Sequence, residues 1–183
     1  RSPSRGLGDV YKRQLVLKDY RNMVSVVSQD IYLFNSSIRD NICMYKDIDD
    51  KFIMEACKDS GLADFISEVS LDYVVGQNGA MLSGGQKQKI ALARALVHNS
   101  PVIIFDEATS NTDVYSEHQI NGLLHTKLKE KMVIIITHKQ EILKEADQII
   151  MLKDGAVVGS GVYDDLSKDN LEFKNMLNMG EKY

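Results

Sequence analysis

The sequence predicts an α/β fold with a mainly parallel sheet. Strand-sized apolar runs alternate with helical segments over most of the chain, and the run Val102–Phe105 holds four apolar residues in succession. Such a run suits a strand that is covered on both faces. With 183 residues, the chain can bury one sizeable core, so we expect one domain or a large piece of one.

The elements are predicted in a regular order. After the strand-like Leu15–Leu17, a first apolar strand covers Val24–Val27, and a helix-rich stretch follows from about residue 50 to residue 97, with a helix stop at Ser60-Gly61. The later elements are the strand 102–105, a helix at about 114–128, a strand at 133–137, a short helix near 140–144, a strand at 148–152 joined through Asp154-Gly155 to a strand at 156–158, and two helices near 163–167 and 172–178.

The first fourteen residues differ from the rest. The segment 1–14 is rich in glycine and arginine and lacks apolar periodicity, so a disordered arm is the plain interpretation. Alternatively, Asp9–Gln14 resembles the translation of a transposon end used in DNA library preparation, which would make the segment non-native. We therefore predict a division into residues 1–14, non-native or disordered, and residues 15–183, folded.

Composition excludes several classes of protein. The chain has 26 acidic and 22 basic residues and a net charge of -4, so no broad electropositive face for nucleic acid is expected. Cys43 and Cys57 lie far apart in sequence and lack metal-ligand spacing, which predicts ordinary reduced thiols. The apolar runs are far shorter than the ~20 residues of a membrane helix, so this chain should not cross a bilayer by itself.

The strongest chemical signal is Leu82-Ser83-Gly84-Gly85-Gln86, which opens a helical run. Ser83 can cap the helix, and the two glycines let bare backbone N–H groups approach an anion at the positive helix end. Ser83, Gly84, Gly85 and Gln86 are therefore candidate phosphate-binding residues. For the pentapeptide alone, a plain Ser-Gly-Gly helix start in a linker is the alternative interpretation.

Polar residues also follow three of the predicted strands. Asp106 and Glu107 come directly after Val102–Phe105, where carboxylates point into the crevice in which α/β folds bind ligands. His138 ends the next apolar strand at the same edge of the sheet, and Gln29 follows the first strand. Taken singly, each position often has a purely structural explanation. The carboxylates can end a strand in solvent, the histidine can form structural hydrogen bonds, and a lone glutamine carries almost no information.

Together these motifs resemble the ATP-binding cassette (ABC) ATPases, over essentially the whole stretch from about residue 24 to residue 166. Leu82–Gln86 and the helix after it resemble the family's signature motif, and the strand ending in Asp106-Glu107 resembles Walker B. Ile31–Ile42 resembles the segment that begins the helical subdomain of exporter-type cassettes. The resemblance implies a P-loop NTPase-like ABC ATPase core at about residues 101–183 and a helical signature subdomain at about residues 30–100.

The resemblance also implies roles for single residues. Asp106 would join the shell of Mg²⁺, with Gln29 contributing partly through water, and both would bind ATP. Glu107 would polarise the attacking water as general base, and His138 would contact the γ-phosphate. Asp113 matches the family's D-loop aspartate and would belong to the ATP-binding residues, although polar residues replace the apolar ones before it.

Partners follow from the same resemblance. It implies a head-to-tail dimer with a second ABC ATPase domain, identical or different, in which Ser83–Gln86 act on the partner's ATP. The other implied partner is a transmembrane domain on the same full-length chain, which places the cassette at the cytoplasmic face of the cell membrane to power export. A soluble ABC-type ATPase acting on the ribosome or on DNA is the main alternative, and a degenerate, non-hydrolytic cassette is another.

One expected motif is absent from the sequence. No G-x-x-x-x-G-K-[ST] loop occurs: Gly79 and Gly84 have the right spacing, but Gly85 stands where the lysine is needed. We therefore expect a cassette that is N-terminally truncated, lacks the first strands and Walker A, and exposes apolar faces of neighbouring strands. On its own it should bind ATP very weakly and hydrolyse none measurably. Gln77 also replaces the glutamate common in exporters.

Overall fold

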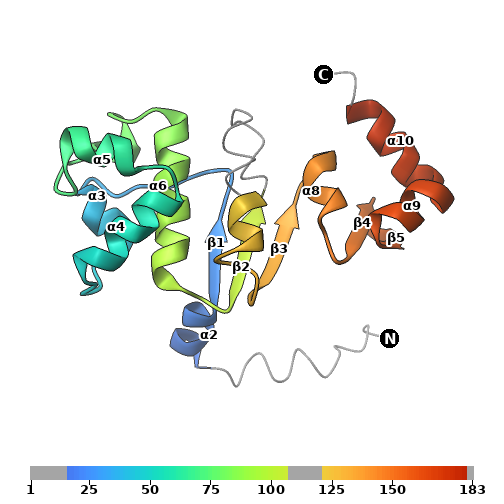
Figure 1. The fold of residues 1–183 in the computed structure, drawn as a ribbon, viewed down its shortest axis with the longest axis horizontal. Helices are drawn as coiled ribbons and strands as arrows, with labels where there is room; N and C mark the ends of the chain where they lie inside the picture. Colours follow the sequence, from blue (N-terminus) through green and yellow to red (C-terminus); the bar gives the residue numbers. More distant parts are fainter. Residues whose placement is uncertain (1–15, 107–120, 181–183) are drawn as a thin grey trace, which may run out of the picture. The chain divides into compact units, whose positions relative to one another are not determined.

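The computed structural model describes residues 16–106 and 121–180, which fall into two compact units divided between Ile135 and Ile136. The first unit contains α2 (Leu17–Met23), β1 (Val24–Val27), α3 (Ile38–Cys43), α4 (Asp50–Asp59), α5 (Ala63–Val69), the 3-10 helix η1 (Gln77–Gly79), α6 (Gly84–His98) and β2 (Val102–Asp106), with β3 (Met132–Ile136) at its end (Figure 1). The second contains α8 (Gln140–Lys144), β4 (Ile149–Lys153), β5 (Ala156–Gly161), α9 (Tyr163–Asp169) and α10 (Leu171–Gly180).

The sheet of the first unit has the order β1-β2-β3. β1 pairs with β2 in parallel, with Val27 opposite Phe105, and β3 runs in the same direction in Figure 1. Val27, Ile103 and Phe105 are buried on the face that packs against α6 and against Leu123 and Leu128. The predicted α/β fold with a parallel sheet is thereby confirmed.

The opposite face of this sheet remains accessible to solvent. Val26 is 56% exposed, Met132 64% and Ile134 44%. Val102 and Ile104 are only half-buried, so the prediction of a β2 strand covered on both faces is wrong. Apolar strand faces are uncovered, as the sequence had led us to expect.

A second core lies among the helices α3 to α6. Leu33, Ile38, Ile42, Ile53 and Leu62 are completely buried there, together with side chains of α6. Cys43 and Cys57 belong to this core as free, buried thiols, and burial raises the pKa of Cys57 to about 11. Both thiols are therefore packing groups with little thiolate character near neutral pH.

Two predicted elements differ from the structure. The strand-like start predicted at residues 15–17 is wrong at Leu17, which begins the helix α2, and residue 15 lies outside the described residues. The first turn of α2 carries Asp19 and its last turn carries Arg21. These charges complement the helix dipole, and three apolar residues alone do not distinguish a strand from a helix start. The helix predicted to reach residue 128 ends at His125 and continues as hydrogen-bonded turns.

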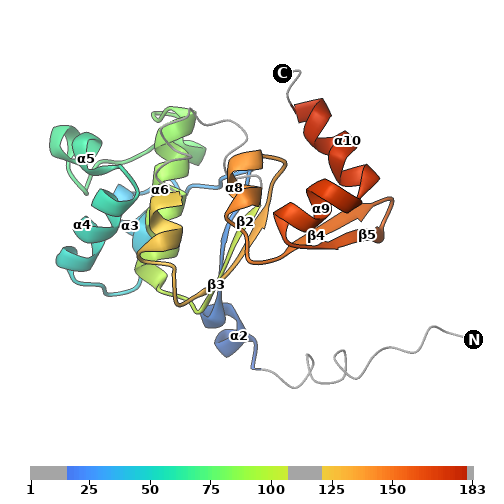
Figure 2. The same ribbon diagram turned by 45° about the vertical axis from the view of Figure 1, so that its right-hand side comes forward.

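The second unit is built on a hairpin. β4 and β5 pair antiparallel, and the predicted turn at Asp154-Gly155 is confirmed, with φ of 50° and 77° at the two residues. α9 and α10 pack on the hairpin (Figure 2). Phe173 is completely buried there, and its ring lies 5.6 Å from that of Tyr163. Within the described ranges, no helix is both long enough and apolar enough to span a membrane.

Gly159 in β5 is closely packed, so a larger side chain at this position should lower the stability of the fold. A Cβ there would lie 2.7 Å from Asn170 Nδ2, and Asn170 cannot move freely because it donates to the Val158 carbonyl and accepts from the Phe173 N–H. We expect Gly159→Ala to lower the free energy of unfolding by about 1–3 kcal/mol through overpacking. Gly161→Ala is the matched control in the same strand, since its Cβ would make ordinary contact with Leu166 at 3.6 Å. Equal denaturation midpoints for the two variants would contradict the prediction.

Candidate functional site

The amino end of α6 carries the predicted phosphate-binding residues. Ser83 is the N-cap: its Oγ accepts from the Gln86 N–H at 3.2 Å, and the Gln86 side chain accepts from the Ser83 N–H at 2.8 Å. This reciprocal capping box satisfies two backbone donors of the first turn. The Ser83 hydroxyl accepts one hydrogen bond here, so its own proton is still available to an incoming acceptor.

Gly84 and Gly85 form the exposed first turn of this helix. Their N–H groups lie at helix positions that have no partner further back in the helix. Among the described residues, a Cβ at either glycine would meet no atom from another part of the chain within 4 Å, so these residues leave the side of this turn open. The helix dipole adds partial positive charge here, and the turn can therefore bind an anion such as a phosphate.

The ends of β1 and β2 bring two further predicted residues to one edge of the sheet. Because Val27 pairs with Phe105 in parallel, Gln29 follows β1 at the edge where Asp106 ends β2. Both side chains are exposed. α6 begins at this end of the unit and runs back alongside the strands (Figure 1). The anion-binding turn and the polar strand ends thus share one end of the first unit.

The residues at this edge fit a hard cation. Asp106 supplies carboxylate oxygens and Gln29 an amide oxygen, which are the donors that Mg²⁺ prefers. Over the described residues, no group of three or more His, Cys, Asp or Glu side chains could hold a metal ion. Magnesium bound here would therefore need phosphate oxygens or water to complete its shell, as is usual for this ion.

The structure does not place three predicted residues relative to the others. Glu107 and Asp113 lie outside the described residues. His138 is exposed and belongs to the second unit, where it lies between Thr137 and Lys139, and Thr137 Oγ1 accepts from the Lys139 N–H at 3.1 Å. The meeting of Glu107 and His138 at one phosphate stays a prediction.

Asn41 is a buried support that the sequence analysis did not single out. It is completely buried in α3, and its Oδ1 accepts from the Phe34 N–H at 2.8 Å. Its Nδ2 donates to the Phe34 and Ser37 carbonyls, both at 3.0 Å, and to Ser36 Oγ at 3.3 Å. One side chain therefore fixes the turn that carries the chain from Gln29 into α3. The sequence feature that could have identified this role is an asparagine one helical turn after the apolar Ile38.

Arg94 ties the same segment to α6. Its Nε donates to the Asn41 carbonyl at 2.8 Å, and both terminal nitrogens donate to the Tyr32 carbonyl at 3.3–3.4 Å. Burial lowers the pKa of Arg94, but arginine starts so high that it remains a cation near neutral pH. The middle of α6 thus holds the segment after Gln29, because the Arg94 side chain donates to two of its backbone carbonyls.

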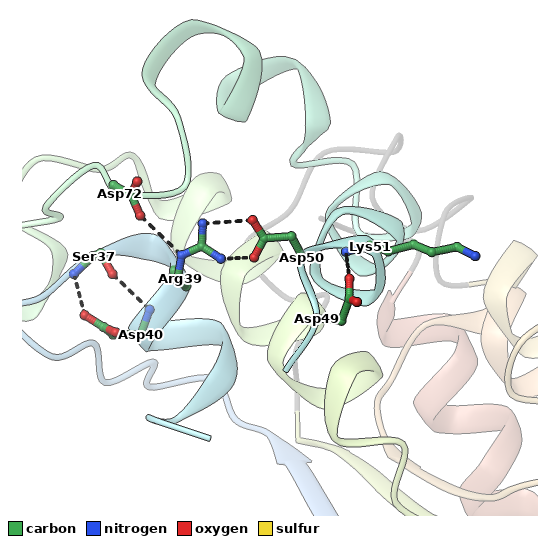
Figure 3. Close-up of polar contacts among 7 residues, drawn as sticks. All are labelled: Ser37, Arg39, Asp40, Asp49, Asp50, Lys51 and Asp72. Atoms are coloured by element: carbon green, nitrogen blue, oxygen red, sulfur yellow. Dashed lines mark hydrogen bonds and ion pairs between the residues drawn. The ribbon is translucent and has the colours of Figure 1, made fainter. Parts of the chain in front are cut away.

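Arg39 joins three parts of the helical region at its surface (Figure 3). Its Nε donates to Asp72 at 3.2 Å, and its terminal nitrogens donate to both carboxylate oxygens of Asp50 in the first turn of α4. Hydrogen bonding to Asp50, and then to Asp72, raises the pKa of Arg39. Both carboxylates are well exposed, so this network orients α3, α4 and the loop after α5 with only a small contribution to stability.

Replacing Asn41 should destabilise the helical core. Asn41→Ala leaves the Phe34 N–H without its acceptor and removes one of two hydrogen bonds at each of the Phe34 and Ser37 carbonyls, which keep their backbone donors. We expect a loss of about 1–3 kcal/mol in the free energy of unfolding. Ser67→Ala is the control, because it removes one exposed hydrogen bond to the Asp64 carbonyl in α5. Urea denaturation followed by circular dichroism measures both. A loss for Asn41→Ala no larger than that of the control would refute the supporting role.

A family model, curated proteins and solved structures all relate the chain to ABC transporters. A protein-family model described as ABC transporter matches residues 7–110. The ATP-dependent lipid A-core flippases of Escherichia coli (strain K12) and Shigella flexneri are each 39% identical to the chain over 158 residues, or 84% of the chain. The solved structure of a bacterial Atm1-family ABC exporter with ATP bound superposes with a TM-score of 0.84 and 31% identity over 91% of the chain.

These relatives are much longer than the chain. It spans 27% of the length of the two flippases and 30% of the exporter chain.

Proposed function

Because the chain belongs to the ABC transporter family, we propose that it serves as part of the nucleotide-binding domain of an ATP-driven exporter. The observation that carries this proposal is the exposed turn Ser83-Gly84-Gly85, capped and open in front, at the start of a helix of 15 residues. Backbone N–H groups, a serine hydroxyl and the helix dipole converge there on the space that a phosphate would fill.

We assign the other roles as follows. Asp106 and Gln29 would hold Mg²⁺ together with phosphate oxygens, and the ion would neutralise charge that develops on the transferred phosphoryl group. Glu107 would orient and deprotonate the attacking water, and His138 would donate a hydrogen bond to the γ-phosphate. Asp113 would serve at the contact with the second nucleotide-binding domain.

The proposed assembly has two further parts. A second ABC ATPase domain, identical or different, would pack head to tail so that Ser83–Gln86 contact its ATP, while Gln29 and Asp106 contact the chain's own ATP. A transmembrane domain would be the partner of the helical region, with the cassette at the cytoplasmic face of the membrane. The names of the relatives, a flippase and an exporter, support this over a ribosomal or DNA-associated role.

The 183 residues alone should not hydrolyse ATP, because their sequence contains no G-x-x-x-x-G-K-[ST] loop to hold the β- and γ-phosphates. Calorimetry on the chain as it stands would then detect no micromolar ATP binding. Tests of activity therefore use the full-length protein that carries this chain.

Gly85→Ala separates the proposed function from a structural role. The new methyl group has open space, and alanine is favoured over glycine in a helix by roughly 0.5–1 kcal/mol, so thermal stability should not fall. The methyl group would, however, obstruct a phosphate approaching the backbone, and we expect ATPase activity to fall more than tenfold. Gly122→Ala is the matched control, since Gly122 is helical with equally open space. Full activity in Gly85→Ala would remove the central support of the proposal.

Glu107→Gln tests the chemical step. Loss of the general base should reduce the turnover number about 10²- to 10⁴-fold while nucleotide binding persists. Glu130→Gln, an exposed change in a turn of the same unit, controls for the lost charge. Phosphate release measures turnover and a fluorescent ATP analogue measures binding. Comparable turnover in the two variants would exclude Glu107 as the base.

A further inference from the structure

Asn78 lies where two parts of the proposed site meet. It is in the middle of η1, with a left-handed backbone at φ 50° and ψ 34°. Its Oδ1 accepts from the Leu33 N–H at 3.2 Å, and its backbone carbonyl accepts from Lys87 Nζ at 2.9 Å. Leu33 follows Gln29 by four residues, and Lys87 lies in the first turns of α6.

The neighbouring Gly79 shows how tightly these segments meet. A Cβ on Gly79 would lie 2.8 Å from Leu33 Cδ1 and 3.1 Å from Lys87 Cε. Leu33 is completely buried. The Leu82 N–H donates to the Gly79 carbonyl at 3.0 Å, and Leu82 is the residue directly before Ser83. A displacement of the segment after Gln29 must therefore be transmitted to η1 and the start of α6.

We propose that Asn78 is a positioning residue that couples the segment after Gln29 to the anion-binding turn Ser83-Gly84-Gly85. This inference rests on the proposed function and deepens it. In the proposed dimer, Gln29 contacts the chain's own ATP and Ser83 contacts the partner's ATP. The Asn78 side chain thus links the two nucleotide sites, so that magnesium nucleotide at one site orders the turn that completes the other.

Two substitutions isolate the side-chain hydrogen bond. Asn78→Gly keeps the left-handed backbone without strain and retains the carbonyl that binds Lys87, but it removes the acceptor for Leu33. Asn78→Asp keeps an acceptor oxygen at the same position. Asn99→Gly is the matched control, because Asn99 is also left-handed at φ 50° and its Oδ1 accepts from a lysine, Lys131, at 2.7 Å, but at the opposite end of α6.

The first measurement is amide hydrogen exchange in the full-length protein. We expect Asn78→Gly to accelerate exchange about two- to tenfold, the factor contributed by one hydrogen bond, at Leu33 and also at Gln86 and Lys87. Those two amides bond to Ser83 and report the order of its turn. Asn78→Asp should restore wild-type exchange. Acceleration confined to Leu33, or equal acceleration in Asn99→Gly, would overturn the coupling.

The second measurement is ATPase rate against ATP concentration. Asn78→Gly should lower kcat about fivefold and bring the Hill coefficient towards 1 while ATP binding to the isolated subunit is unchanged, and Asn78→Asp should behave as wild type. Wild-type kinetics in Asn78→Gly, or equal losses in both Asn78 variants, would refute the positioning role. If the wild-type protein hydrolyses no ATP, the proposed function fails, and the exchange measurement alone decides whether the coupling exists.

Discussion

The rest of the first unit depends on the burial of α6 between two cores. Ile90 and Ala93 pack into the helical core, while Ala91, Leu92 and Ala95 pack against the sheet. The helix therefore has apolar contacts on two sides, and small alanines let both neighbours approach closely. Because neither core can shift without the helix, the position of the capped turn at Ser83 is set by the packing of the whole unit.

This arrangement explains which features could be predicted from the sequence. Features that depend on consecutive residues could be predicted: the capped glycine turn at Ser83, the parallel strand ending in Asp106, and the Asp154-Gly155 hairpin. Asn78 and Arg94 could not be predicted, because their partners are set by tertiary contacts, up to 62 residues away for the pair Arg94 and Tyr32. Nor could Asn41, although its side-chain partners lie only four to seven residues away, because the irregular turn that brings them together has no sequence pattern of its own. A polar residue in a sequence does not reveal which distant carbonyl it will meet.

The helix α2 and the outer face of the sheet show a second limit of sequence reasoning. A run of three apolar residues before residue 18 is equally compatible with a strand or with the start of a helix, and the following charges decide the outcome. The apolar run of β2 correctly predicts a strand, but it does not say whether a layer packs on each face. Coverage depends on other segments, so half-buried Val102 and Ile104 follow from the packing and not from their own sequence.

Four of the chain's glycines fall into two groups according to how closely other atoms pack around them. A Cβ on Gly79 or Gly159 would approach a neighbour within 2.8 Å, so packing accounts for both. Gly84 and Gly85 have open space and lie in a helix, where alanine would be more stable by roughly 0.5–1 kcal/mol. Neither packing nor backbone conformation requires glycine at these two positions. In the function proposed above, a group outside the chain that approaches the bare backbone would require it, and the N–H groups of the first helical turn and the Ser83 hydroxyl suit an anion in that place.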